Sequence, residues 1–223
     1  MKKIFITAAL LGAFSNLSLA ADIRPYIEGQ LGWSSADDVD TKAYSGTVSG
    51  VAYNGRVQVQ TDSSLSGGVE LGVSNVGIEN FRIGASYNRA QYDMSKVLAI
   101  GSLSYHGSTY AGSVDVTSNL RADGISFDNS VNLYMLNAYY DIKTSSPFTP
   151  FIGASIGLAD IEHAKDNEFA YGVSAGAKYN FDKNIYLGVK GSFTRVNGAT
   201  DKLGIEYEDI DLWSAHALLG YEF

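Results

Sequence analysis

The chain has 223 residues, a formal net charge of −8, 24 glycines, three prolines and no cysteine. The lack of cysteine excludes a disulfide framework and thiolate metal sites, and the acidic balance argues against nucleic-acid binding, which needs a basic face. Frequent glycine and tyrosine with scarce proline are typical of strands and turns. The composition therefore favours an all-β chain.

The first twenty residues have the pattern of a secretory signal peptide. MKK supplies a positive start, IFITAALLGAF an apolar run, and Ser18-Leu19-Ala20 a small-x-small cleavage site. The apolar run of about eleven residues is too short to span a bilayer as a helix, which takes about twenty. We predict a signal peptide at 1–20 and a single β-barrel domain at 21–223.

Eight later segments alternate between apolar and polar or small residues for about ten positions each. Strands of about 9–11 residues, tilted near 45°, are the length that a membrane barrel needs. The segments are 25–34, 66–74, 81–92, 131–142, 150–159, 169–181, 185–196 and 212–223.

The connections between these segments alternate in length. Short turns at one rim and longer loops at the other are the layout of outer-membrane barrels, whose termini lie on the periplasmic, short-turn side. The pattern predicts a transmembrane antiparallel up-and-down β-barrel of eight strands, with long extracellular loops. The short links are 75–80, 143–149 and 182–184, and the longer ones are 35–65, 93–130, 160–168 and 197–211.

The two longest loops also contain alternating segments. AYNGRVQVQ predicts a hairpin that turns at Asn54-Gly55, formed by the first two barrel strands continuing beyond the membrane. Residues 97–107 and 110–118 alternate too, and ten strands would result if both crossed the membrane. We favour eight, because ten would leave Asp93–Lys96 as an unusually short outer loop.

Aromatic residues recur at both ends of the predicted strands. They lie on the strand face that points outward when Phe223 is assigned to the outside. An apolar band of about 25 Å with aromatic girdles is characteristic of barrels in lipid. A soluble β-sandwich, the main alternative, would not need aromatic rings at two fixed heights. The predicted girdle residues are Trp33, Phe81, Tyr87, Tyr140, Tyr171, Tyr179, Phe181, Phe193, Trp213, Tyr221 and Phe223.

The opposite parity places charged residues inside the barrel, beginning with the glutamate of PYIEGQLGW. The lumen of an eight-stranded barrel is filled by side chains, and buried charges require partners. We predict an ion-pair network of Glu28, Glu70, Arg82, Lys178 and Lys190. Its role is a static plug or, as the alternative, a switchable gate for small ions; which base meets Glu28 stays open.

Few residues suggest catalysis or metal binding. Ser214 and His216 share a strand face, but their parity points into the lumen and no orienting carboxylate is evident. His163 and the acidic residues of loops 160–168 and 197–211 match no calcium-loop template. We expect no enzymatic activity, no metal and no cofactor.

Several stretches carry a family resemblance: TPFIGASIGLA, FAYGVSAGAKYNF, NAYYDI and the terminal LLGYEF. They resemble the opacity-type (Opa/NspA-like) outer-membrane proteins, relatives of the OmpA transmembrane domain and of the Ail/Lom surface proteins. The resemblance implies a monomeric eight-stranded barrel whose loops often bind host surfaces. It also implies that Leu219, Tyr221 and Phe223 form the signal read by the outer-membrane assembly machinery.

The resulting hypothesis is a Gram-negative outer-membrane barrel that presents its loops for adhesion, host-factor binding or another surface interaction. Tyrosine suits adaptable binding loops, so the contact candidates are Tyr44, Tyr53, Tyr105 and Tyr110. Expected partners are membrane lipid and lipopolysaccharide, the assembly machinery, and a host surface or matrix protein. The alternatives are a structural membrane protein without a specific ligand and a narrow gated ion channel.

Overall fold

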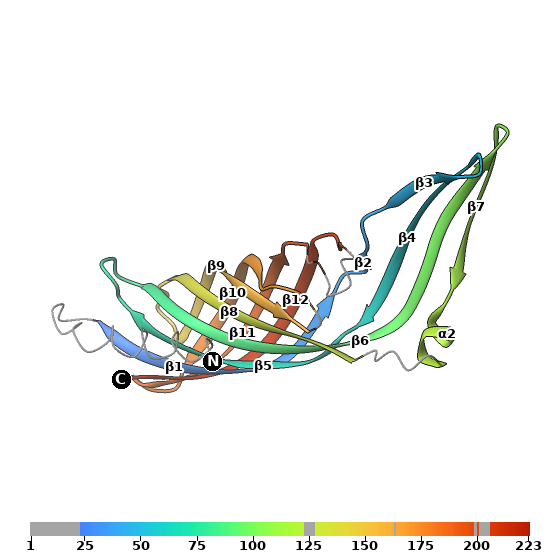
Figure 1. Ribbon diagram of the computed structural model, residues 1–223. Helices are drawn as coiled ribbons and strands as arrows, with labels where there is room; N and C mark the ends of the chain where they lie inside the picture. The colour runs from blue at the N-terminus through green and yellow to red at the C-terminus, as the bar shows by residue number, and fades with distance from the viewer. Residues whose placement is uncertain (1–22, 123–127, 163, 199, 201–205) are drawn as a thin grey trace.

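The computed structural model describes residues 23–122, 128–162, 164–198, 200 and 206–223 (Figure 1). At 92–94 and 128–129 it describes the backbone alone. The predicted signal peptide and His163 fall outside the described residues.

Eight antiparallel strands form a closed barrel, which confirms the predicted fold and strand count (Figure 1). Each strand pairs with the next one along the chain, and the last pairs with the first, Ile27 lying opposite Tyr221. The predicted segments match these strands to within a residue or two at most ends, and β6 is much longer than expected. The barrel strands are β1 (Arg24–Ala36), β5 (Ser64–Ser74), β6 (Phe81–Tyr105), β8 (Asp128–Asp141), β9 (Phe148–Ile161), β10 (Glu168–Asn180), β11 (Ile185–Val196) and β12 (Ile210–Glu222).

Alternation along each strand separates an apolar outside from a filled interior. On β1 the side chains of Leu31 and Trp33 are exposed on the outside, whereas Tyr26, Glu28 and Gln30 are buried. Successive residues of a strand point to opposite faces, so one alternating segment supplies both the lipid-facing surface and the lumen. In the described part of the chain, no helix has the length and apolar character needed to cross a membrane.

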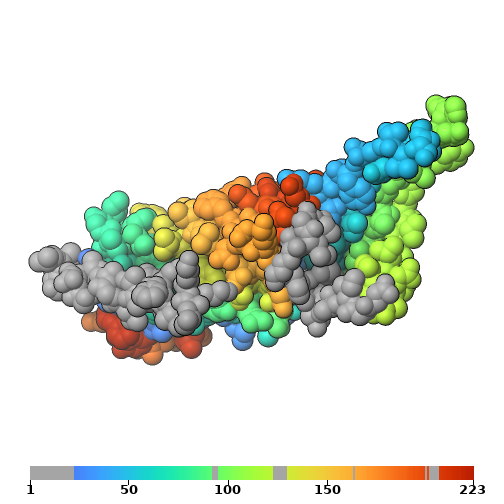
Figure 2. Space-filling view, in the orientation of Figure 1, coloured from blue at the N-terminus to red at the C-terminus, as the bar shows by residue number. Residues whose placement is uncertain are grey.

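The sheet continues beyond the loop end of the barrel as an extension, called the outer sheet below (Figures 1 and 2). It consists of β2 (Val39–Asp40), β3 (Tyr44–Val48), β4 (Val51–Asp62), residues 96–105 of β6, and β7 (Ser108–Asp115). A short helix, α2 (Thr117–Ala122), follows β7. The outer sheet is continuous with the barrel because β6 belongs to both.

A bulge in β6 separates its barrel part from its outer part. Gln60 of β4 pairs with Lys96, whereas the next residue, Thr61, pairs with Met94, so Ser95 is the extra residue. One extra residue shifts the alternation of a strand by one. The even-numbered residues from Arg82 to Ala90 therefore face the lumen before the bulge, and the odd-numbered residues from Val97 to Tyr105 continue that side after it.

The structure corrects the predicted layout of the two long loops. Asn54 and Gly55 lie within β4, and the turn falls at Ser49-Gly50, where φ is 51° and 80°. These values fit a type I′ turn, in which both central residues need positive φ. The resulting register of β3 and β4 pairs Gly55 with Tyr44, whose ring lies against the glycine. The extended strands are the second and third of the barrel, not the first and second.

The hairpin of β6 and β7 explains the ambiguity about ten strands. Its turn is His106-Gly107, with φ of 48° and 80°, and residues 97–115 pair within the outer sheet rather than crossing the membrane. Their alternation arises because the outer sheet has one apolar face. The sequence of such a strand has the same two-residue period as that of a membrane strand. Eight strands thus form the barrel.

Two glycines of β1 provide a test of how tightly the barrel is closed. A Cβ at Gly32 would clash with the carbonyl oxygen of Ala215 on β12, whereas a Cβ at Gly29 would lie 3.9 Å from the nearest atom, the carbonyl oxygen of Leu219. We expect Gly32→Ala to lower the free energy of unfolding in lipid vesicles by about 1–3 kcal/mol, and Gly29→Ala to change it much less. Urea titration followed by tryptophan fluorescence measures both; equal effects would contradict this account of the close approach.

Candidate functional site

The outer sheet has one apolar face. Register and alternation place the odd-numbered residues of β4 and outer β6 on the same face as the even-numbered residues of β3 and β7. In one row Tyr53 lies opposite Leu103, which lies opposite Tyr110. The larger apolar members of this face are Tyr44, Val48, Val51, Tyr53, Val57, Val59, Val97, Leu103, Tyr105, Tyr110 and Val114.

All four tyrosines proposed as contact residues lie on this face. Tyr110 is 73% exposed, and Tyr44, Tyr53 and Tyr105 are also exposed. They come from four strands and from both long loops, so the sequence alone could not show that they share a surface. Isolated exposed apolar side chains are common, but a contiguous group marks an interaction site.

Three glycines interrupt the larger side chains of the apolar face. Gly55, Gly101 and Gly112 form one row, next to the row of Tyr53, Leu103 and Tyr110. The ring of Tyr44 lies close to Gly55, while a Cβ at Gly112 would meet no atom within 4 Å. The backbone at Gly112 is therefore accessible to an approaching partner.

The opposite face of the outer sheet is mostly polar, with Leu98 and Ile100 of β6 as its larger apolar members. Asn54, Ser102 and Thr109 lie on it, and its base carries an ion pair between Arg56 and Asp40 at 3.2 Å. The outer sheet is thus amphipathic, although it lies outside the membrane-spanning part of the barrel.

Contacts from other outer loops hold the base of the outer sheet. The ammonium of Lys42 lies 2.8 Å from a carboxylate oxygen of Glu206, and Thr41 forms a β-bridge with Tyr207. The hydrogen bond and charge of Lys42 lower the pKa of Glu206, and those of Glu206 raise the pKa of Lys42. This contact is present above the ordinary glutamate pKa and weakens as the pH falls through the lowered pKa of Glu206.

The predicted lumen residues are all buried within the barrel. Glu28, Glu70, Arg82, Lys178 and Lys190 are each less than 9% exposed. Their short-range partners differ from the expected pairs, because the described contacts of both glutamates are neutral hydrogen-bond donors. The expectation that Glu28 pairs directly with one of the three bases is therefore corrected.

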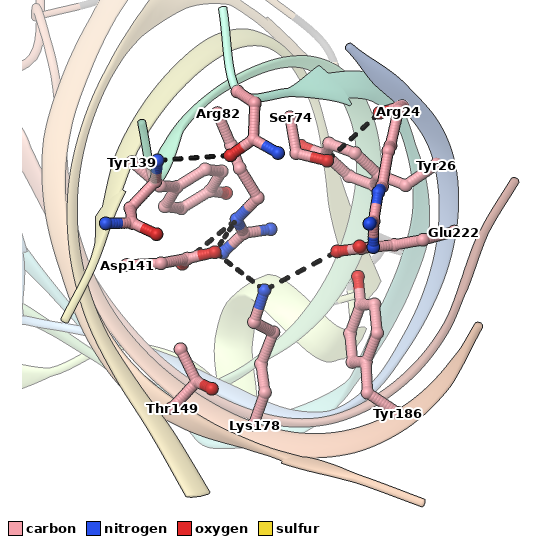
Figure 3. A network of polar contacts seen from close by, with 12 residues as sticks. Arg24, Tyr26, Ser74, Arg82, Tyr139, Asp141, Thr149, Lys178, Tyr186 and Glu222 are labelled. Atoms are coloured by element: carbon pink, nitrogen blue, oxygen red, sulfur yellow. Dashed lines mark hydrogen bonds and ion pairs between the residues drawn. The ribbon is translucent and has the colours of Figure 1, made fainter. Parts of the chain in front are cut away.

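Asp141 is the carboxylate that Arg82 and Lys178 share (Figure 3). Its carboxylate oxygen Oδ2 lies 3.0 Å from Arg82 Nε and 2.8 Å from Lys178 Nζ, and Lys178 also faces Glu222 at 3.7 Å. The guanidinium of Arg82 lies 4.6 Å from the ring centroid of Tyr139. Asp141 has the lumen parity on β8, and its position beside both bases depends on the stagger of the strands.

Glu28 and Glu70 lie directly opposite each other on β1 and β5. Gln30 Nε2 donates to both, at 2.9 Å to Glu28 and 3.4 Å to Glu70. Tyrosine hydroxyls and Asn137 satisfy most of the remaining acceptors: Tyr186 donates to Glu28 at 2.7 Å, and Tyr26, Tyr139 and Asn137 donate to Glu70 at 2.5, 2.9 and 2.9 Å. Lumen parity could have identified these tyrosines as donors.

A hydroxyl-rich layer lies farther along the lumen. Ser66 bridges His216 Nε2 and Ser34, each at 2.8 Å, and Ser34 contacts Ser214 at 2.6 Å. A cavity of about 50 Å³ adjoins these residues. Ser214 and His216 are therefore linked through two other serines, an arrangement that fits lumen packing.

An apolar layer fills the outer part of the lumen. It packs residues from seven barrel strands, so the interior is occupied by side chains at this level as well as at the ionic layer. Its buried members are Ala36, Ala90, Val131, Leu133, Met135, Ala159, Ala170, Val196 and Leu212.

The predicted girdle aromatics lie on the outside of the barrel, as their parity requires. Phe193 packs against Trp213 with ring centroids 4.8 Å apart, and Tyr221 packs against Phe223 at 5.0 Å. The register puts the first pair toward the loop end and Tyr221 beside Ile27 at the opposite end. Leu219, Tyr221 and Phe223 are all exposed there.

The shared carboxylate gives a test of the lumen network. Asp141→Asn would leave Arg82 and Lys178 buried without their common counter-charge, so we expect a loss of about 3–5 kcal/mol in the free energy of unfolding in vesicles. The control is Glu79→Gln, which removes the carboxylate of an exposed ion pair with Lys143 and should have no measurable effect. Similar unfolding midpoints for both variants would refute the proposed role of Asp141.

Comparison with solved structures supports the fold. Neisserial surface protein A is 15% identical with a TM-score of 0.50, covering 89% of this chain and 97% of that one. Outer membrane protein AlkL is 12% identical with a TM-score of 0.51, covering 92% and 93%. At these identities the likeness concerns the fold alone.

Sequence comparison identifies the family. Outer membrane protein PagN of Salmonella typhimurium (strain LT2) is 36% identical over 81 residues, 28% of this chain and 34% of PagN, so the match spans about a third of that relative. Protein opa of Haemophilus influenzae is 34% identical over 86 residues, 30% of this chain and 71% of that protein. The surface antigen family model matches residues 47–218. The chain therefore belongs to the surface antigen family and is a Gram-negative outer-membrane β-barrel protein.

Proposed function

We propose that this protein is an adhesin-like recognition barrel that binds a host-surface or matrix protein through the apolar face of its outer sheet. The observation that carries the proposal is the placement of Tyr44, Tyr53, Tyr105 and Tyr110 on one exposed face. Tyrosine buries a large area on binding at a low cost in side-chain entropy, and its hydroxyl adds hydrogen bonds. The proposed activity is binding, without catalysis or a cofactor.

The scaffold supports this function because it limits the motion of the contact residues. Strand β6 runs for 25 residues from the barrel into the outer sheet, with a bulge at Ser95, and Lys42 and Glu206 link the base of that sheet to another loop. A preorganised surface loses less conformational entropy on binding than a mobile loop. The acidic character of the chain favours partners with a basic rim around an apolar patch.

The other proposed partners follow from the location. Exposed apolar and aromatic residues of the barrel wall would contact lipid and lipopolysaccharide, and Leu219, Tyr221 and Phe223 would be read during assembly. We propose that residues 1–20 direct export before that step. The filled lumen supports surface binding better than ion conduction.

The tyrosine face can be tested on bacteria that display the protein. Replacing Tyr53 and Tyr105 with serine should reduce attachment to cultured epithelial cells by tenfold or more, because it removes two aromatic contacts from the proposed surface. The matched control replaces their chain neighbours Asn54 (with serine) and Ser104 (with alanine), which lie on the polar face of the same strands. Attachment is counted by microscopy at equal surface expression.

The same experiment separates the proposal from its main alternative. Equal attachment by the parent, the tyrosine variant and cells lacking the protein would indicate a structural membrane protein without this activity. Loss of attachment in the control variant to the same extent would move the contact surface away from the tyrosine face.

A further inference from the structure

The free edge of β7 suggests a second interaction, made mainly by backbone groups along the edge rather than by the side chains of the tyrosine face. β7 pairs with β6 on one side, and no strand of the described residues pairs with its other side. All eight of its residues are exposed. Unpaired backbone groups at a sheet edge are a template for another strand.

The hairpin turn determines which backbone groups of β7 point away from β6. A two-residue I′ turn at His106-Gly107 makes Tyr105 and Ser108 a hydrogen-bonded pair, and such pairs then alternate along the ladder. Ser108, Tyr110, Gly112 and Val114 consequently bond to β6. Thr109, Ala111, Ser113 and Asp115 direct their N–H and C=O groups outward.

The edge lacks the features by which proteins usually block strand addition. Natural edges carry lysine, proline, bulges or inward-pointing charges. In β7 the sequence STYAGSV precedes its one charged residue, Asp115, and the pairing with β6 shows no bulge. The backbone of this segment is therefore open to another strand.

The sequence of β7 is complementary to itself. With a two-fold axis at Gly112, Tyr110 of one copy lies opposite Val114 of the other, and Ala111 lies opposite Ser113. Aromatic and β-branched residues are favourable cross-strand pairs, and Asp115 lies opposite Thr109, so like charges do not meet. The outward backbone groups fall opposite one another in this register, which allows about eight hydrogen bonds.

We propose that β7 binds the β7 strand of a second copy in antiparallel register centred on Gly112, joining two outer sheets edge to edge. The two copies belong to facing membranes. Two copies in one membrane are related by a rotation about the membrane normal, so their β7 strands both run in the same direction relative to the membrane. Two copies in facing membranes have β7 strands that run in opposite directions, as antiparallel pairing requires. The outer sheet extends beyond the barrel mouth, where it can reach a facing cell (Figure 1). The barrel remains a monomer within its own membrane.

A proline substitution tests the backbone contacts. Ala111→Pro removes an outward N–H while leaving the ladder to β6 intact, a position at which an edge strand tolerates proline. The control, Ala111→Val, keeps the N–H and adds a side chain of similar bulk. In vesicles reconstituted with the protein, we expect clustering measured by light scattering to fall at least tenfold for Ala111→Pro and to persist for Ala111→Val.

A cysteine cross-link tests the register without relying on the proline variant. The chain has no cysteine, and Gly112 has room for a side chain. Gly112→Cys should form a disulfide between two separately tagged vesicle populations under mild oxidation, because its counterpart lies directly opposite. Ser102→Cys, on the inner strand β6, should not. Heat-modifiable gel mobility verifies that each variant is folded.

The outcomes distinguish this proposal from the proposed function. Clustering by Ala111→Pro at the parental level, or absence of the Gly112→Cys cross-link between populations, would overturn edge pairing. A cross-link formed only within one population would place the contact in a single membrane and would also overturn it. Attachment to epithelial cells depends on Tyr53 and Tyr105, so Ala111→Pro should leave attachment unchanged if both proposals hold.

Discussion

The rest of the structure depends on the need to fill and neutralise the interior of a narrow barrel. Eight strands enclose a space that side chains must occupy, and ionised groups there cannot remain unpaired. Asp141 neutralises two bases at one level, while Glu28 and Glu70 receive hydrogen bonds from tyrosine and amide groups at the next. An apolar layer completes the filling. With its interior occupied in this way, the barrel acts as a rigid support.

That support determines how the outer sheet can function. β6 continues from the barrel into the outer sheet through one bulge at Ser95, so the apolar face is held by the barrel wall rather than by a flexible loop. The two proposed activities use different parts of the same sheet: aromatic side chains on a face, and backbone groups along an edge. Because the two are chemically distinct, one can be lost without the other.

The sequence predicts the barrel well because each strand repeats one simple constraint. The parity of Glu28 in PYIEGQLGW and the short turn at every second connection predict the barrel and favour eight strands, while the alternation of 97–107 and 110–118 leaves ten as the alternative. The partners inside the lumen were harder to predict, because whether Asp141 or Glu28 meets Arg82 depends on the stagger between strands that are distant in sequence. The turn at Ser49-Gly50 was missed because Asn54-Gly55 is the stronger turn dipeptide, yet tertiary pairing kept it within a strand. The common face of the four tyrosines depends on registers that no single segment encodes.

The bulge residue Ser95 determines which side chains of β6 lie on the apolar face of the outer sheet. As the extra residue in β6, it exchanges the two sides of the strand between the barrel and the outer sheet. The odd-numbered residues of β6 thus face lipid in the barrel. In the outer sheet, beyond the bulge, the odd-numbered residues form the apolar surface, which continues the lumen side. A single inserted or deleted codon at this position would present the other face of the outer half of β6 while leaving its composition almost unchanged. The length of β6, and not only its residue types, therefore determines which surface this protein displays.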